Sequence, residues 1–505
     1  MGIGWKVTRG VFAASNSIGK QMSNSAATSA AIRKANRGQR AVKRGFIGPW
    51  DEVPANAQDF LDYSGVATPE DLDIPPWAFP LGRYVLPKAT MFGGGFPSKN
   101  EIGLSPELAN RHTVVYAPAG SGKTASVIVP WIYEAMEQGY LVVALDLKGN
   151  GDLLSQVRQY AAAKKPLPDV AITNFDYTDP RESVTWNWIR DLKDDEAATE
   201  AATEALVGRK RDNDPNKEFH LRDMKWMRGL LEYASSSGHS WTVGSLLRLL
   251  DDQPRFARYI TNAAPERARS RLADLVYDAD YYTKVQFVST YLEMLNTPGF
   301  NRVTSRRGLR MKNTGDEPGL LMVTAPLADG KMSEAVSGLF LSQFLTTQLH
   351  KFNTSSRPVL LVLDEAPRLQ ERLNLPKLMA TSRSSGLSAL LALQEIEDFK
   401  KDDRETILSN CVTHILLPGA GAETTGYFGK RLGSRQVSRK TQSLNYSRQS
   451  GPTFQTGVQM NEVPVLGRTE MMSPPGGSHH ALVHCHELSH KPILVDLTRY
   501  DLLDG

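Results

Sequence analysis

The chain has only two cysteines among its 505 residues, Cys411 and Cys485, and they lie far apart in the sequence. So few cysteines exclude a disulfide-stapled secreted fold and suit a reducing cytosol. Long hydrophobic runs are also missing, because no apolar stretch approaches the roughly 18 residues that span a bilayer. The basic start MGIGWKVTRG is followed by no apolar signal segment. We therefore expect a protein with no membrane span of its own.

Acidic residues are absent from the first 50 positions, which hold nine Lys or Arg. This stretch predicts either a solvated basic tail or an arm that touches DNA, an anionic membrane or a partner. The whole chain is only mildly basic, with a net charge of +4, so the total permits a nucleic-acid partner without arguing for one. Its 41% hydrophobic and 23% charged residues are those of a globular protein, and its length predicts two or three domains.

What the sequence does have is a glycine-rich stretch, APAGSGKT, between a strand-like run at Thr113–Tyr116 and a helix-like run. It fits the P-loop (Walker A) spacing G-x-x-x-x-G-K-[ST], except that Ala117 stands at the first glycine position. Glycine-rich backbone and the start of a helix both attract phosphate oxygens. We predict that Lys123 reaches the β- and γ-phosphates of ATP and that the Thr124 hydroxyl binds Mg²⁺. The predicted nucleotide contacts are Ala117, Gly120, Ser121, Gly122, Lys123, Thr124 and Ala125.

Two carboxylates end the unbroken apolar run Val359–Leu363, which is typical of a buried parallel strand. The carboxyl ends of such strands are where α/β sheets bind ligands. We therefore predict that Asp364 holds Mg²⁺, as a Walker B aspartate does, and that Glu365 orients or polarises the attacking water. A second strand-like run, LSALLALQ, ends in Gln394. Two roles are open for this residue: sensing the γ-phosphate, or simply capping the strand.

Hydrolysis by P-loop motors often needs an arginine from the neighbouring subunit. The stretch TSRSSG places Arg383 shortly before the Gln394 strand, and we rank it ahead of Arg368 and Arg431 for this role. A surface arginine without a catalytic part is the alternative.

The number of residues between the glycine-rich loop and the acidic pair further limits the class of P-loop ATPase to which the chain can belong. Lys123 and Asp364 are 241 positions apart, far more than a minimal sheet-and-helix ATPase core needs. Residues 187–301 show helical periodicity, as at Leu221, Met224, Met227 and Leu231, and few strand signals. We predict a basic tail and linker at 1–80, a nucleotide-binding domain built from 81–186 and 302–505, and an inserted all-helical domain at 187–301. The alternative is a set of crossover helices within one domain.

These motifs, in this order and spacing, resemble the type IV coupling proteins, the ATPases of conjugation and type IV secretion. The stretches that carry the resemblance are APAGSGKTASVIVP, VVALDLKGNGDL, VLLVLDEAPRL and SRSSGLSALLALQ. The D-x-K-G after the second strand is the most discriminating, because it marks this family and its FtsK/HerA-like cousins. The resemblance implies an α/β, RecA-like P-loop motor domain with a mainly parallel central sheet, usually assembled as a hexameric ring. Family members typically carry N-terminal membrane spans, and this sequence shows none.

The resemblance also implies a function. We expect an ATP-driven protein that moves single-stranded DNA, with its attached relaxase, or protein substrates toward a type IV secretion channel at the cytoplasmic face of the inner membrane. Two basic stretches without acids, Asn301–Lys312 and Gly429–Gln449, predict DNA-contacting loops; solvated loop faces are the alternative. Two other functions stay open: an FtsK/HerA-like double-stranded DNA pump, and a docking adaptor that binds ATP without pumping.

Overall fold

The structure is a computed structural model that describes residues 67, 78–85, 97–149, 151–164, 171–209, 215–314, 316–350, 357–447, 451–472 and 480–497. The basic stretch at the start of the chain lies outside these residues. The chain divides into two compact units, and each is described by itself. The larger unit comprises Ile74–Leu81, Ile102–Thr424 and Thr498–Gly505, and the smaller comprises Met1–Asp73, Gly82–Glu101 and Thr425–Leu497.

A parallel sheet forms the core of the larger unit, with strands in the order β9-β3-β8-β7-β4-β6-β5. The strands are β3 Thr113–Tyr116, β4 Leu141–Asp146, β5 Ala171–Asp176, β6 Gly319–Thr324, β7 Val359–Leu363, β8 Leu387–Leu393 and β9 Thr413–Leu416. β3, β4 and β6 to β9 are buried along their whole length. Burial on both faces explains why these strands are apolar without alternation. The mainly parallel sheet of the predicted fold class is confirmed.

The strand register brings the carboxyl ends of three strands to one edge. Tyr116 pairs with Leu393, and Leu363 pairs with Leu391, so β3, β8 and β7 end within two residues of one another. β8 lies between β3, which leads into the glycine-rich loop, and β7, which leads into the acidic pair. Any side chains that follow these strands therefore emerge side by side.

Helices and short turns connect the strands. They are α3 Pro106–Ala109, the π-helix η2 Thr124–Ile128, α4 Val129–Glu137, α5 Asp152–Lys164, η4 Leu327–Asp329, α14 Lys331–His350, η5 Ala366–Leu369, α15 Leu375–Thr381, η6 Ser382–Ser385, η7 Ile396–Asp398 and α16 Lys401–Ser409. α14 is buried on nearly every side along its length. A helix surrounded in this way belongs to the core rather than to the surface.

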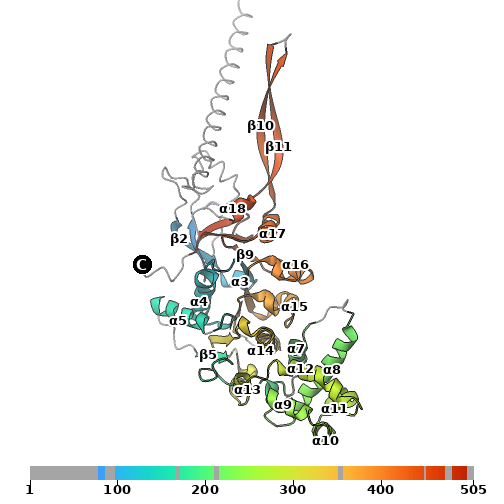
Figure 1. Cartoon of the computed structure of the whole chain (residues 1–505). Coiled ribbons are helices and arrows are strands. Elements are labelled where there is room, and N and C mark those ends of the chain that lie inside the picture. The colour runs from blue at the N-terminus through green and yellow to red at the C-terminus, as the bar shows by residue number, and fades with distance from the viewer. Residues whose placement is uncertain are drawn as a thin grey trace, which may run out of the picture. The chain divides into compact units, whose positions relative to one another are not determined.

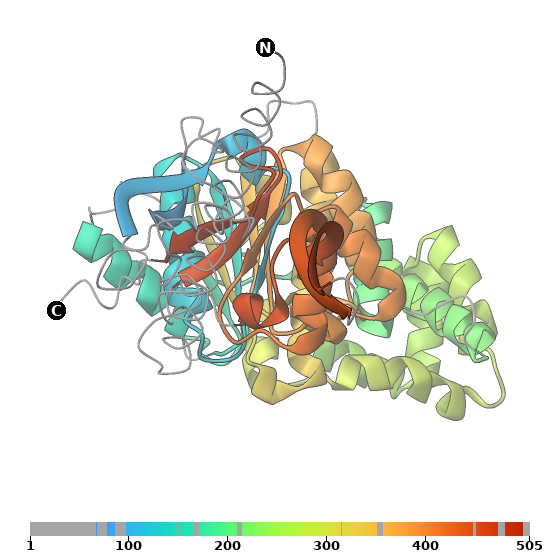
Figure 2. The ribbon, with the colours of Figure 1, turned by 90° about the horizontal axis from the view of Figure 1, so that it is seen from above.

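Between β5 and β6 the described residues form helices and no strand. These are α6 Trp188–Asp191, α7 Glu196–Val207, α8 Lys217–Ser236, α9 Val243–Leu250, α10 Gln253–Ala263, α11 Glu266–Val276, α12 Tyr281–Glu293 and α13 Pro298–Thr304, followed by the short η3 Met311–Asn313. Several begin with a side-chain cap, such as Asp195 before α7 and Thr242, in a capping box, before α9. The helices α8 to α12 gather at one end of the larger unit (Figures 1 and 2). The domain boundaries at 187 and 301 stay predictions.

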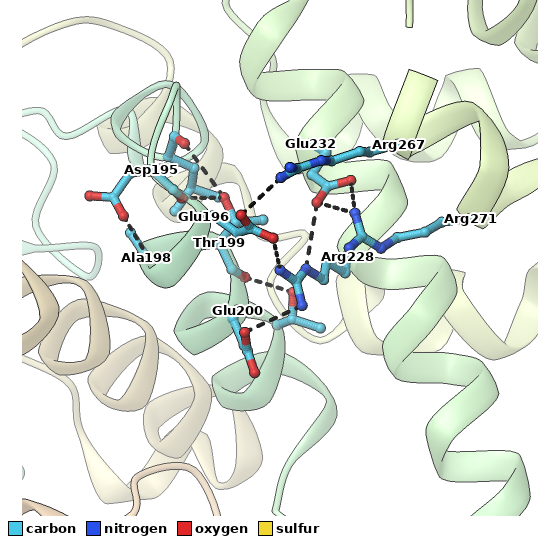
Figure 3. A network of polar contacts seen from close by, with 11 residues as sticks. Asp195, Glu196, Ala198, Thr199, Glu200, Arg228, Glu232, Arg267 and Arg271 are labelled. Atoms are coloured by element: carbon cyan, nitrogen blue, oxygen red, sulfur yellow. Dashed lines mark hydrogen bonds and ion pairs between the residues drawn. The ribbon is translucent and has the colours of Figure 1, made fainter. Parts of the chain in front are cut away.

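Ion pairs join three of these helices (Figure 3). Arg228 on α8 lies 2.8 Å from Glu196 and 3.3 Å from Glu200, both on α7. Arg267 on α11 also pairs with Glu196, at 2.9 Å, and Arg271 pairs with Glu232. Because most of these carboxylates are half exposed, each pair contributes about 1 kcal/mol or less, and the network mainly fixes the relative register of the helices.

A partly buried arginine joins the end of α7 to the segment that follows the acidic pair. Arg372 Nη1 donates to the carbonyls of Ala205, at 3.2 Å, and Leu206. The neighbouring backbone is joined as well, since Arg209 N donates to Glu371 O at 2.8 Å. Gly338 on α14 leaves the necessary room, because a Cβ there would lie 2.5 Å from Arg372 Cβ. The carbonyls of Ala205 and Leu206, in the last turn of α7, are thus capped by the segment that follows β7.

The smaller unit has an antiparallel sheet in the order β2-β1-β13-β12, from strands β1 Phe79–Val85, β2 Pro97–Leu104, β12 His480–Cys485 and β13 Ile493–Asp496. Strands β1 and β2 and helix α17 Ala422–Leu432 run across the division between the units. Strands β10 Ser434–Ser447 and β11 Gly451–Pro464 form a two-stranded ribbon, and α18 Arg468–Met472 follows. Most of the basic stretch Gly429–Gln449, for which a loop was expected, is therefore strand β10.

None of the helices in the described part of the chain combines the length and hydrophobicity that crossing a bilayer requires.

Replacing Arg372 with Ala should destabilise the larger unit, because buried carbonyls at the end of α7 lose their donor at about 1–3 kcal/mol each. We expect Arg372→Ala to lower the melting temperature by roughly 5 °C or more in scanning calorimetry. Lys225→Ala is the control, since it breaks an ion pair whose side chains are 43% and 52% exposed. It should shift the melting temperature by less than about 2 °C. Equal shifts in the two variants would contradict this assignment.

Candidate functional site

The glycine-rich loop leaves β3 with a defined geometry. Ala117 N donates to Leu393 O at 3.0 Å, which fixes the start of the loop to β8. Gly120 and Gly122 have φ angles of 78° and 85°, in the left-handed region that favours glycine. Ala117 is fully buried and is not among the residues with positive φ, so this position does not require a glycine. The departure from the usual spacing is therefore compatible with the loop's shape.

The helix after the loop begins as a π-helix. Thr124 is the first residue of η2, and Ser126 N donates to Gly122 O at 2.9 Å. The α-helical α4 starts at Val129 and has Pro130 in its first turn. Pro130 has no N–H to donate, so the change from π to α geometry falls where an ordinary helical hydrogen bond is missing. Short π segments of this kind often occur at functional sites.

Lys123 lies between the two acidic side chains that follow β7. Its Nζ is 3.0 Å from Asp364 Oδ1 and 2.8 Å from Glu365 Oε1, and the residue is only 6% exposed. Burial alone would lower the pKa of Lys123, but attraction to Asp364 and the hydrogen bond and charge of Glu365 outweigh it, so the pKa is raised. The ammonium group therefore stays charged inside the protein.

Glu365 is held in an uncommon conformation. Its φ of 63° and ψ of 45° lie in the left-handed region, which costs a non-glycine residue about 1 kcal/mol or more. Gln394, directly after β8, donates from Nε2 to Glu365 Oε1 at 3.0 Å. Burial would raise the pKa of Glu365, but the hydrogen bonds from Lys123 and Gln394 dominate and lower it. Strain of this kind at a strand end is typical of a functional position.

A second lysine, Lys148, for which no role was predicted, reaches the same place. Lys148 Nζ donates to Thr124 Oγ1 at 3.3 Å. Its loop is shaped by Asp146, whose Oδ1 accepts from the backbone N of Lys148 and Gly149, each at 3.1 Å, and whose Oδ2 accepts from Leu153 N at 3.3 Å. The D-x-K-G stretch contained the signal, because a lysine at the carboxyl end of a neighbouring strand faces the same sheet edge.

The three arginines considered for action between subunits lie in different places. Arg383 is in the turn η6 before β8, and its side chain lies outside the described residues. Arg368 is exposed and lines a cavity of about 280 Å³ together with Glu365 and Gln394. Arg431 lies near the end of α17, in the smaller unit.

In this parallel sheet, β3 leads into the glycine-rich loop and β7 leads into the acidic pair. Strand β8 lies between them and is followed by the polar Gln394. This arrangement defines the RecA-like P-loop class. Residues 98–489 match the family described as the type IV secretion-system coupling protein DNA-binding domain, and the chain belongs to this family. No match was found among curated protein sequences.

Solved structures support the fold. The unbound bacterial conjugative coupling protein TrwBdeltaN70 superposes with a TM-score of 0.59, at 17% identity, over 83% of this chain and 89% of that one. TrwB in complex with ADP and Mg²⁺, and TrwB with a non-hydrolysable ATP analogue, each give 0.59 at 16% identity, over 79% of this chain and 87% of theirs. The predicted resemblance to the coupling proteins is thereby confirmed, as is the RecA-like fold with its set of helices.

The glycine positions are not equivalent, and this difference is measurable. Gly122→Ala places a Cβ on a residue with a φ of 85° and should lower the affinity for an ATP analogue about tenfold, since the strain is roughly 1–2 kcal/mol. Ala117→Gly should leave that affinity within about twofold, because no positive φ is required there. Calorimetric titration of both variants checks the contrast. A large loss for Ala117→Gly would show that the loop has a different shape.

Lys148 should contribute to anion binding through its place beside Thr124. Lys148→Ala should weaken binding of a magnesium-loaded ATP analogue about tenfold, because one phosphate-directed cation is lost. Lys148→Arg should retain most of the affinity. Lys164→Ala, at the exposed end of α5, is the matched control and should bind normally. If Lys148→Ala bound the ATP analogue as tightly as this control does, Lys148 would have no part in nucleotide binding.

Proposed function

We propose that the chain is an ATP-hydrolysing coupling protein that recruits and moves single-stranded DNA with its attached relaxase, or protein substrates, to a type IV secretion or conjugation channel. The observation that carries the proposal is the placement of Lys123 between Asp364 and Glu365, at the edge where the glycine-rich loop leaves the sheet. Membership of the coupling protein family supports the transport role. Structures of TrwB named as complexes with ADP and Mg²⁺ or an ATP analogue support the ligand.

The residues present fit a nucleotide triphosphate with Mg²⁺. A Cβ on Gly120 would meet nothing within 4 Å, so the inner side of the loop is open to a ligand. The Ser121 hydroxyl is buried and has no hydrogen-bond partner among the described residues, which suits a phosphate oxygen. Thr124 and Asp364 supply the hard oxygen atoms that Mg²⁺ prefers. When bound, the metal would supply positive charge to the phosphate oxygens.

Each side chain then has a defined task. With nucleotide bound, Lys123 would exchange its ion pairs with the two acids for contacts to the β- and γ-phosphates. Thr124 and Asp364 would hold the metal, and Lys148 would add charge beside Thr124. Glu365 orients the attacking water and accepts its hydrogen bond, while Gln394 fixes Glu365 through the 3.0 Å contact. Because Glu365 is held on a strained backbone, its carboxylate is positioned before the substrate arrives.

The assembled form that we propose is a homo-hexameric ring in which Arg383 of one subunit completes the site of the next. The family resemblance supports the ring, and the place of Arg383 in the short turn η6 before β8 makes it our candidate for this contact. Closure at such shared sites would convert hydrolysis into relative movement of neighbours. The chain would work at the cytoplasmic face of the inner membrane, held there by inner-membrane components of the secretion system.

The helices after β5 offer a surface for protein cargo. Phe219 and Leu221 on α8 and Phe287 on α12 are exposed by 59%, 57% and 45%. Arg222 joins the two helices there, with its guanidinium 5.2 Å from the Phe219 ring centre and 4.4 Å from that of Phe287. Leu221 lies on helix α8, as its spacing predicted, but its side chain is exposed. We propose that a relaxase-type substrate docks on this patch, since exposed apolar side chains mark interaction sites.

The test of the proposed function is the ATPase rate per chain as a function of protein concentration, with and without single-stranded DNA. We expect the rate to rise with concentration and with DNA, because complete sites need two subunits. Glu365→Gln should lower turnover at least about a hundredfold while ATP still binds, and Lys123→Ala should lose both.

Three results would change the proposal. A rate per chain that does not depend on concentration would remove the need for Arg383 of a neighbour. Stimulation by duplex rather than single-stranded DNA would favour the double-stranded pump. Wild-type transfer by Lys123→Ala would favour the docking adaptor.

A further inference from the structure

A second cluster of cations surrounds a cavity of about 340 Å³ in the larger unit, separate from the residues of the glycine-rich loop. Two segments line it: the region of α6, and the loop from Arg307 into η3. Its cations are Arg190, Lys193, Arg307, Arg310 and Lys312, and its carboxylates are Asp191 and Asp194. We call this cavity with its five cations the basic pocket. The five cations outnumber the two carboxylates, so the cavity attracts anions.

Arg310 and Lys312 attract Asp191, but no cation of the basic pocket is held in a close ion pair among the described residues. Within the described residues, none of the five forms an ion pair, in contrast to Arg228, Arg267 and Arg271 in the helical network. The carboxylate of Asp191 already has hydrogen-bond donors, since its Oδ2 accepts from Trp186 Nε1 at 3.0 Å and from Met311 N at 3.1 Å. Five cations facing two carboxylates leave an excess of positive charge, and a bound anion relieves the repulsion among the cations.

The loop that carries three of these cations is held in a fixed shape. A Cβ on Gly308 would lie 2.2 Å from Thr185 O, so this position admits only glycine without movement of the backbone. Leu309 N donates to the same Thr185 carbonyl at 2.8 Å, and Thr185 Oγ1 donates to Arg307 O at 3.3 Å. Backbone that is ordered before binding loses less entropy when a ligand arrives. The arrangement is therefore that of a preformed site.

The lining selects the chemistry of the ligand. It contains no aromatic side chain and one apolar residue, Leu309, so it offers nothing on which a base or another flat ring could stack. Arginine and lysine side chains spread around a polar cavity match phosphate groups instead. Since the chain belongs to a family described as DNA-binding, successive phosphates of a nucleic-acid strand are the anions that it would meet.

We propose that the basic pocket binds backbone phosphates of single-stranded DNA. The motor would thereby hold the strand whatever its base sequence. The inference rests on the proposed function in that the chain handles DNA, and it adds where the strand is held. The basic stretch Asn301–Lys312 supplies three of the cations, whereas Arg190 and Lys193 come from a segment far earlier in the sequence. Together they make one site from two separate segments.

The test uses the full chain and a fluorescein-labelled oligo(dT) probe in anisotropy titrations at several salt concentrations. Arg307→Gln combined with Arg310→Gln should weaken binding about tenfold or more. The slope of log affinity against log salt should become shallower by about 1.4, because each phosphate contact to a single strand contributes about 0.7. The melting temperature and the affinity for a fluorescent ATP analogue should not change, since these exposed side chains lie outside the glycine-rich loop.

The matched control is Arg258→Gln combined with Arg269→Gln, which removes the same charge from exposed positions on α10 and α11. It should alter probe binding less than about twofold. Equal binding by the pocket variant and this control would overturn the inference and leave the proposed function standing. A wild-type chain that binds no probe would overturn both. Inorganic triphosphate is added as a competitor. If it displaces the probe at a concentration lower than that of the probe's own phosphates, the pocket binds free polyphosphate and the DNA assignment is overturned.

Discussion

The structure depends on one buried electrostatic arrangement, an ammonium group held between two carboxylates. Lys123, Asp364 and Glu365 come from segments 241 positions apart, and the register of β3, β8 and β7 brings them together. Two negative charges face one positive charge, so the site keeps an excess of negative charge that a divalent cation can neutralise. Leaving one of these charges unpaired would cost several kcal/mol. The sheet must therefore keep its parallel register for the site to exist.

The segment that follows β7 is joined by hydrogen bonds to the helices that follow β5. Arg372, which caps the carbonyls at the end of α7, lies seven positions after Glu365. The backbone contact between Arg209 and Glu371 is a second link between the same two segments. Movement of the acidic strand end would thus be carried to α7 through hydrogen bonds, and α7 is joined to α8 and α11 by the ion pairs of Figure 3. This is a continuous physical connection between the site and the helical part of the chain.

Much of the fold followed from the sequence because its signals are local. Unbroken apolar runs predict buried parallel strands, and the loop at Ala117–Thr124 and the pair after Leu363 predict where the strands end. The roles given to the site residues stay predictions, although the structure brings Lys123, Asp364, Glu365 and Gln394 together.

Contacts between distant segments could not be predicted in this way. The approach of Lys148 to Thr124 and the meeting of Arg190 with Arg307 depend on how loops fold back, which no periodicity records. Composition misled in one place. Serine-rich sequence favoured a loop where strand β10 forms, because pairing with β11 outweighs weak strand propensity. The periodicity in α8 correctly predicted a helix, although Leu221 is exposed whereas Met227 and Leu231 are buried.

The most direct test of the central claim is calorimetric titration of a non-hydrolysable ATP analogue into the full chain, with and without Mg²⁺, for the wild type and for Asp364→Asn. The account predicts one analogue per chain, tighter binding with Mg²⁺ in the wild type, and loss of that magnesium dependence in the variant. Binding that depends on neither Mg²⁺ nor Asp364 would contradict it, because the triphosphate would then lie somewhere other than between the glycine-rich loop and the acidic strand end.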